Sequence, residues 1–150
     1  MKNTLLLVCA GLMFSLSTQA QKKKIKAKTK FTVPEKVNTT FKDSYSDAAN
    51  SKWSKSNTGY FVADFTNANA QKQIVEYNAE GALVKSKTFI DVNALPENIN
   101  TSVQTRYSGA AVKELVRVEI PGVAPYYKAT IDNNGRKKEL LISEQGSIAE

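Results

Sequence analysis

Histidine is absent from this chain of 150 residues, and cysteine occurs once, at Cys9. A Ser-His-Asp triad or a Cys-His pair needs side chains that the rest of the sequence does not contain. Zinc sites mostly use histidine and cysteine ligands, so a zinc centre is not expected either. The sequence also lacks a glycine-rich phosphate-binding loop. We therefore expect a protein that is not an enzyme and holds neither a metal ion nor another cofactor.

Charged residues are missing from a run near the N-terminus. Residues 4–16 are uncharged and mostly apolar, Lys2 precedes them, and small side chains follow at Thr18 and Ala20. This layout is typical of a secretory signal peptide, which predicts residues 1–20 as the signal and export to the periplasm or the medium. The run is shorter than the ~20 apolar residues that a membrane-spanning helix needs. Cleavage after Ala20 would remove Cys9 and leave a mature chain without disulfides.

The excess of positive charge is confined to a short stretch after the predicted cleavage site. The chain has 21 Lys and Arg against 14 Asp and Glu, yet residues 31–150 hold 14 of each. A neutral folded part offers no basic face for nucleic acid, so no nucleic-acid partner is expected. Residues 21–31 are predicted to form a disordered basic tail, either a solvated spacer or a weak contact with an anionic membrane surface. The lysines of this tail are Lys22, Lys23, Lys24, Lys26, Lys28 and Lys30.

An internal duplication organises the rest of the chain. Residues 33–49 align with residues 95–111, and eight of the seventeen positions are identical. Chance would give about one identity over such a length, so the similarity indicates a true repeat. We predict two tandem repeats, residues 32–91 and residues 92–150.

Each repeat is predicted to begin with a helix. Pro34 and Pro96 suit the first helical position, where a missing N–H costs nothing, and Glu35 and Glu97 follow at the positive end of the helix dipole. Apolar residues then recur every four positions, which gives each helix one core-facing stripe. The stripes consist of Val33, Val37, Phe41 and Tyr45 in the first repeat and of Leu95, Ile99, Val103 and Tyr107 in the second.

After each helix the hydrophobic pattern changes to a period of two, which predicts strands. Helices followed by antiparallel hairpins are typical of the α+β class. One repeat of about 60 residues buries too little surface by itself, so we expect both repeats to share one curved sheet with the helices on one face. The expected strands cover residues 61–65, 71–77 and 82–90 in the first repeat and residues 112–120, 126–131 and 137–142 in the second.

A set of short motifs gives the sequence a family resemblance. They are Val-Pro-x-x-Val-x-x-x-Phe-x-x-x-Tyr at residues 33–45, Lys52-Trp53, Gly59-Tyr60-Phe61 and Asn78-Ala79-Glu80-Gly81, with Leu95-Pro96, Tyr107 and Tyr126-Tyr127 in the second repeat. Over residues 32–150 the chain resembles the PepSY-like, beta-lactamase-inhibitor-like domains. The resemblance implies a tandem α+β fold exported to the periplasm. The inhibitor after which these domains are named binds enzymes through an exposed sheet face, but this chain has no match to its inhibitory loops.

The alternation within the strands separates two faces of the sheet. If Phe61, Ala63 and Phe65 face the helices, the residues between them face away. Tyrosines, aliphatic side chains and a lysine on that open face suit the recognition of a protein. The sequence therefore favours an exported, non-enzymatic binding module that engages an envelope protein, including as an inhibitor of a peptidase or another envelope enzyme. The candidate partner-binding residues are Tyr60, Val62, Ile74, Tyr126, Lys128 and Leu141.

Other hypotheses remain open from the sequence. A small-ligand carrier or envelope sensor would hold an apolar molecule or an ion in the hollow of the sheet. A second copy of the chain would also cover the apolar residues of the open face. A weak hydrolase would need a pair of carboxylates, for which Asp64 and Glu76 are the candidates on the outward side of neighbouring strands.

Overall fold

The structure is a computed structural model that describes residues 31–149. The predicted signal peptide and residues 21–30 of the predicted tail lie outside the described residues. The described part contains two helices and eight strands. In chain order they are α1 (Glu35–Ser44), β1 (Ala49–Lys55), β2 (Phe61–Thr66), β3 (Lys72–Tyr77), β4 (Leu83–Ile90), α2 (Glu97–Arg106), β5 (Ala111–Ile120), β6 (Val123–Asn133), β7 (Arg136–Ser143) and β8 (Ile148–Ala149).

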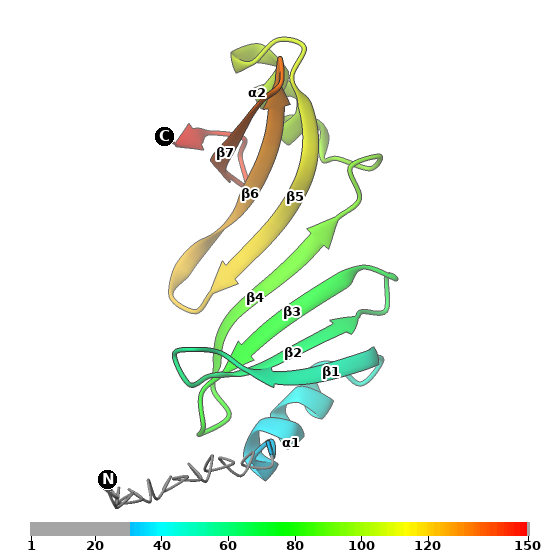
Figure 1. The fold of residues 1–150 in the computed structure, drawn as a ribbon, viewed down its shortest axis with the longest axis vertical. Coiled ribbons are helices and arrows are strands. Elements are labelled where there is room, and N and C mark those ends of the chain that lie inside the picture. Colours follow the sequence, from blue (N-terminus) through cyan, green and yellow to red (C-terminus); the bar gives the residue numbers. More distant parts are fainter. Residues whose placement is uncertain (1–30, 150) are drawn as a thin grey trace, which may run out of the picture. The chain divides into compact units, whose positions relative to one another are not determined.

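All eight strands form one antiparallel sheet in which the spatial order follows the chain, from β1 to β8 (Figure 1). Each repeat contributes one helix and four strands, and the last strand of the second repeat is short. The repeats meet at β4 and β5, whose register runs from Ser86↔Glu119 to Ile90↔Leu115. The predicted α+β class, with tandem repeats in a shared sheet, is confirmed.

Both helices begin one residue later than the proline pattern predicts. Pro34 and Pro96 are the N-cap residues, with ψ angles of 146° and 133°, and the first helical residues are Glu35 and Glu97. The backbone of each proline is therefore still extended, although its carbonyl already accepts the first helical hydrogen bond, from Asn38 in α1. The predicted apolar stripes do face the core.

Two hydrophobic cores hold the helices on the sheet. α1 packs through Val37 and Phe41, and α2 packs through Ile99 and Val103, which are all at most 5% exposed. Figure 1 shows α1 near β1–β3 and α2 near β5–β7. In the first core Phe41 is the hub of an aromatic cluster, with ring centroids 5.1 Å from both Trp53 and Phe65 and 5.6 Å from Tyr45. The strand residues of the cores are Phe61, Ala63, Phe65, Val75 and Tyr77 in the first repeat and Leu115, Ala129, Ile131, Leu140 and Ile142 in the second.

The register shows that both cores lie on the same face of the sheet. Ala63 pairs with Val75, and Val75 pairs with Ser86 on β4. Ile90, four residues after Ser86, pairs with Leu115 of the second core. Residues an even number apart on a strand share a face, so the path from Ala63 to Leu115 never changes side.

The duplication extends to the contact between a turn and its helix. Gly81 precedes β4 and Gly146 precedes β8, and both have positive φ angles, of 85° and 90°. A Cβ on Gly81 would lie 3.1 Å from the carbonyl oxygen of Lys36, and one on Gly146 would lie 3.2 Å from that of Asn98. Lys36 and Asn98 are equivalent residues of α1 and α2. In each repeat, the helix backbone therefore packs closely against the turn before the last strand, because glycine has no side chain there.

Candidate functional site

The sheet face opposite α1 and α2, called the open face below, carries an apolar band over its middle strands. Two cross-strand rows follow from the register. The first row is Ile74, Lys87, Val118 and Tyr126, from β3 to β6. The second row is Phe89, Val116, Lys128 and Leu141, from β4 to β7. Directly opposed side chains in such rows are close enough to interact, so each row is a continuous surface.

Two valines at the centre of this band are buried although they face away from the helices. Val116 is 6% and Val118 is 4% exposed, and neither belongs to a helix-side core. Their cross-strand neighbours include Phe89, Tyr126 and Lys128. The aromatic rings and the aliphatic part of the lysine provide the cover that a second layer would otherwise supply.

Val116, Val118 and Phe89 were not singled out from the sequence. In β5, Val116 and Val118 alternate with the charged Arg117 and Glu119, and such an alternation predicts that the apolar residues face the core. Arg117 and Glu119 share the helix side with Leu115, because Leu115 lies in the second core. In the sequence, Val116, Val118 and Ile120 form an unbroken apolar series with a period of two. By itself this series would predict that their side chains face the helices.

The predicted partner-binding residues fall into two groups on the open face. Val62 and Ile74 lie on β2 and β3, opposite Glu76 and Asp64 respectively. Tyr126, Lys128 and Leu141 lie together on β6 and β7, where Lys128 pairs with Leu141. The rows through Lys87, Val118 and Val116 connect the two groups. Their role in binding stays a prediction.

Tyr60, the remaining predicted residue, lies just before β2 in the turn from β1. Its backbone N–H donates to Ser56 Oγ at 3.0 Å, and its carbonyl accepts from the Ser56 N–H at 2.9 Å. The side chain is partly buried. Tyr60 therefore stands at the border of the open face, and the equivalent Tyr126 stands in the band itself.

Charged side chains surround and interrupt the apolar band. Lys72 Nζ lies 3.3 Å from Asp64 Oδ2 and 5.1 Å from the ring centroid of Phe89. Lys128 Nζ lies 2.9 Å from Glu139 Oε1. Lys87, between Ile74 and Val118 in its row, has no ion pair within residues 31–149. An apolar centre with charges around it is the composition of a recognition surface.

An apolar depression of about 310 Å³ adjoins the band at its β8 end. Tyr126 and Leu141 line it together with Pro125 and Ile148. Leu141 is 47% exposed, which makes it one of the few large apolar side chains open to solvent in the described part. The depression offers room for one apolar side chain of a partner.

On the helix side, polar groups lie at the edge of the first core, on β3 and β4. Gln73 Nε2 donates to Ser86 Oγ at 3.0 Å. Burial raises the pKa of Tyr45, although a hydrogen bond with Ser86 works against that rise. Burial likewise raises the pKa of Tyr77, and the neighbouring Tyr45 adds to it. Tyr77 Oη is buried and has no hydrogen-bond partner among the described residues.

Arg117 links β5 to the turn before β8 on the same side. Its Nε and Nη2 donate to Glu144 Oε1 at 3.0 and 2.7 Å, and its Nη1 lies 2.5 Å from Glu119 Oε1. Burial alone would lower the pKa of Arg117, but the hydrogen bonds to Glu144 and Glu119 outweigh it and raise the pKa. One guanidinium thus bridges two carboxylates, and the cluster keeps a net charge of −1 while it ties β5 to this turn.

Groups of three or more Asp, Glu, His or Cys side chains that could hold a metal are absent from residues 31–149. Asp64 and Glu76 do share the open face on neighbouring strands, but Asp64 is in an ion pair with Lys72. No helix between residues 31 and 149 is long and apolar enough to cross a membrane.

Comparison with known proteins places this geometry in a family. The chain matches the family described as "Putative beta-lactamase-inhibitor-like, PepSY-like" over two overlapping stretches, residues 17–84 and residues 58–150. Two matches in one chain agree with the duplication. None of the curated proteins compared with the chain matches it.

Solved structures from Bacteroides share the fold. A BLIP-like protein from Bacteroides fragilis has a TM-score of 0.71 and 24% identity, over 81% of this chain and 87% of that chain. A DUF2874 family protein from Bacteroides ovatus has a TM-score of 0.71 and 24% identity, over 80% and 86% of the two chains. A protein from Bacteroides eggerthii, described as a "putative periplasmic" protein, has a TM-score of 0.69 and 22% identity, over 80% and 88%.

Proposed function

The chain belongs to the beta-lactamase-inhibitor-like, PepSY-like family, and from that premise we propose that it is a non-enzymatic binding module that engages a protein through its open face. The observation that carries this proposal is the apolar band across β3–β7. It places Ile74, Phe89, Val118, Tyr126 and Leu141 on a sheet face opposite both helices. Aromatic and aliphatic anchors surrounded by charges are what protein interfaces use at their centres.

The rigidity of the face supports recognition of a protein. The band stands on the central strands of an eight-stranded sheet, and both ends of that sheet are held by a helix. A surface built on strands loses little conformational entropy when it is covered, so more of the contact energy remains as affinity. Inhibition of an envelope enzyme is the form of binding that the family description favours.

Export is part of the proposal. The signal peptide expected at residues 1–20 and the relative described as periplasmic both support a location in the periplasm or outside the cell. Cell fractionation of a producing bacterium tests it, and a full-length chain in the cytoplasmic fraction would contradict it.

The test of binding uses the immobilised full chain and a bacterial envelope extract. Wild type is compared with the double variant Tyr126→Ala/Leu141→Ala and with Val92→Ala, which removes an exposed apolar side chain from the loop before α2. A protein retained in equal amounts by wild type and Val92→Ala is then purified. We expect the double variant to bind it at least thirtyfold more weakly, since central anchors typically contribute about 2 kcal/mol or more.

Two results would redirect the interpretation. Equal binding by the double variant would place the interface on another surface and contradict the open-face proposal. The absence of any retained protein, combined with thermal stabilisation by a small envelope metabolite, would favour the small-ligand carrier. If the retained protein is an enzyme, its turnover with and without one equivalent of the chain tests inhibition.

A further inference from the structure

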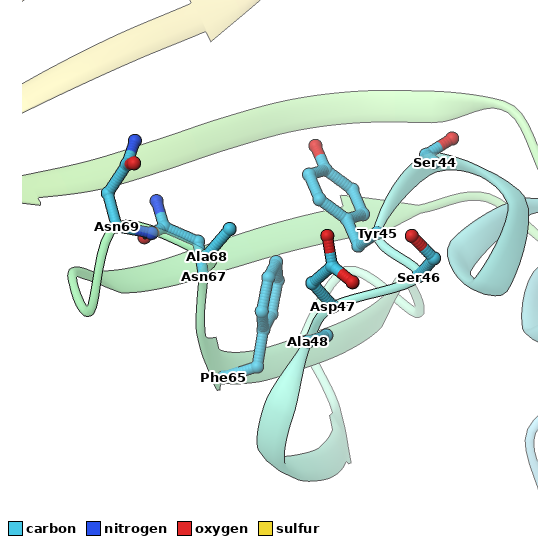
Figure 2. A pocket seen from close by; sticks show the side chains of 9 residues that line it. All are labelled: Ser44, Tyr45, Ser46, Asp47, Ala48, Phe65, Asn67, Ala68 and Asn69. Carbon is cyan, nitrogen blue, oxygen red and sulfur yellow. The ribbon is translucent and has the colours of Figure 1, made fainter.

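A notch of about 170 Å³ opens on the helix side of β2, away from the open face. Its walls are the segment that follows α1 and the hairpin between β2 and β3. Figure 2 shows the rings of Tyr45 and Phe65 beside the carboxylate of Asp47, with Asn67 and Asn69 on the hairpin side. The two ring centroids are 5.0 Å apart. The notch therefore combines aromatic surface with one carboxylate.

In the second repeat, the equivalent tyrosine contacts a lysine of the same chain. Tyr107 is equivalent to Tyr45 in the duplication. The ammonium group of Lys138 lies 2.7 Å from Tyr107 Oη and 4.8 Å from the centroid of its ring. This contact also lowers the pKa of Tyr107, chiefly through the hydrogen bond from Lys138. In the second repeat the chain thus supplies its own ammonium group to the tyrosine.

The first repeat has lost that internal cation and gained a carboxylate. Gln73 pairs with Phe65 as Lys138 pairs with Ile131, so a neutral amide stands where the second repeat has lysine. The Gln73 amide is turned to Ser86, to which it donates a hydrogen bond.

Asp47 stands where the second repeat has Gly109. Its side chain is exposed and makes no ion pair within residues 31–149. Ser44 likewise stands where the second repeat has Arg106, which also hydrogen-bonds to Tyr107. Relative to the second repeat, the surroundings of the tyrosine have lost two cations and gained one carboxylate, and the notch is open to solvent.

We propose that this notch binds an alkylammonium group, carried by a lysine side chain of another protein or by a free amine. Asp47 supplies the counter-charge, and the partly exposed ring of Tyr45 supplies an electron-rich face that attracts a cation, while Phe65 lines the notch as a core residue that is 2% exposed. The methylene groups of the ligand lie against the ring of Tyr45, as lysine stems do on apolar surfaces. The site lies on the helix side, so it does not depend on the function of the open face.

The test is a titration of the ¹⁵N-labelled full chain followed by NMR. The probes are Nα-acetyl-lysine methylamide, its neutral isostere Nα-acetyl-norleucine methylamide, and 1,4-diaminobutane. We expect the lysine derivative to shift the amide signals of residues 44–48 and 67–69, with an affinity at least tenfold above that of the norleucine derivative. A higher affinity for diaminobutane assigns the site to free amines, whereas a higher affinity for the lysine derivative assigns it to protein side chains.

A matched pair of variants distinguishes the contribution of the notch to ligand binding from that of the overall negative charge nearby. Asp47→Asn removes the carboxylate of the notch, and Asp43→Asn removes an exposed carboxylate of α1 that does not line it. We expect Asp47→Asn to weaken binding of the lysine derivative about fivefold at low salt, and Asp43→Asn to change it less than twofold. Equal losses in both variants, equal binding of the norleucine derivative, or no shifts at residues 44–48 and 67–69 would each overturn the proposal.

Discussion

Replacing Gly81 or Gly146 by alanine tests how closely each helix approaches its turn. Both glycines have φ near +90°, where an L-residue costs about 1–2 kcal/mol. A Cβ added at either position would also lie 3.1–3.2 Å from a helix carbonyl oxygen, which is tighter than ordinary van der Waals contact. Pushing the helix away from its core costs about 1–3 kcal/mol more, the usual range for overpacking.

Gly59 provides the control for backbone strain. Its φ of 91° matches the other two, but an added Cβ would meet nothing within 4 Å. Gly59→Ala therefore carries the conformational cost alone, about 1 kcal/mol after the loss of freedom in the unfolded chain is counted. Gly81→Ala and Gly146→Ala add the steric cost, which brings each to about 2–4 kcal/mol.

Urea unfolding followed by far-ultraviolet circular dichroism measures these differences. With a slope of about 1.5 kcal/mol per M, the midpoint should fall by about 0.7 M for Gly59→Ala and by about 1–3 M for the other two variants. Equal losses of stability in all three variants would show that the close approach of turn and helix adds no steric cost. That result would refute the predicted difference between Gly59→Ala and the other two variants.

Two further predictions concern positions where the native residue is not the most stable one. Ala70 has a φ of 57° in the β2–β3 hairpin, a conformation that glycine adopts at lower cost than alanine. Ala70→Gly should therefore raise the free energy of unfolding, measured with urea, by about 0.5–1 kcal/mol. An unchanged or lower urea midpoint would contradict this prediction. Tyr77 Oη is buried without a partner in the described part, so Tyr77→Phe should be neutral or stabilising by up to about 1 kcal/mol near pH 7. Because burial raises the pKa of Tyr77, the unfolded chain loses this proton first, and wild-type stability should be intact below pH ~10 and fall above it. Tyr77→Phe should weaken that alkaline loss, and an identical loss in both proteins would show that Tyr77 does not cause it.

Much of the fold could be predicted because local patterns and the global arrangement agree. The duplication and the two hydrophobic periods predicted both helices and six of the strands to within a few residues. β6 is the largest departure, since it covers Val123–Asn133 where the pattern predicted residues 126–131. Its extra residues at both ends continue the ladder with β5, through Val123↔Ile120 and Asp132↔Ala111. Pairing of this kind depends on the partner strand, which a local pattern does not contain.

The candidate site could be predicted only at its two sides. Alternation with buried neighbours located Val62, Ile74, Tyr126 and Leu141 on the open face, because each lies next to a clear core residue along its strand. At the centre of the band the local pattern pointed the other way, because Val116 and Val118 alternate with the charged Arg117 and Glu119. The notch beside Tyr45 also escaped prediction, because it is formed by segments about twenty residues apart in the chain.

The sequence by itself determined which kinds of catalytic and metal site are not expected, the two repeats, the apolar stripe of each helix and the alternation of most strands. These features depend on local spacing and residue chemistry. Only the tertiary structure decided how the repeats join. Once β4 pairs with β5 in the register Ile90↔Leu115, Leu115 is committed to the second core and Arg117 follows it to the helix side. Val116 and Val118 must then face outward, because neighbouring residues of a strand point to opposite faces. The local alternation of β5, with the charged Arg117 and Glu119 between apolar residues, favours the opposite orientation, so the register with the neighbouring strands made that choice.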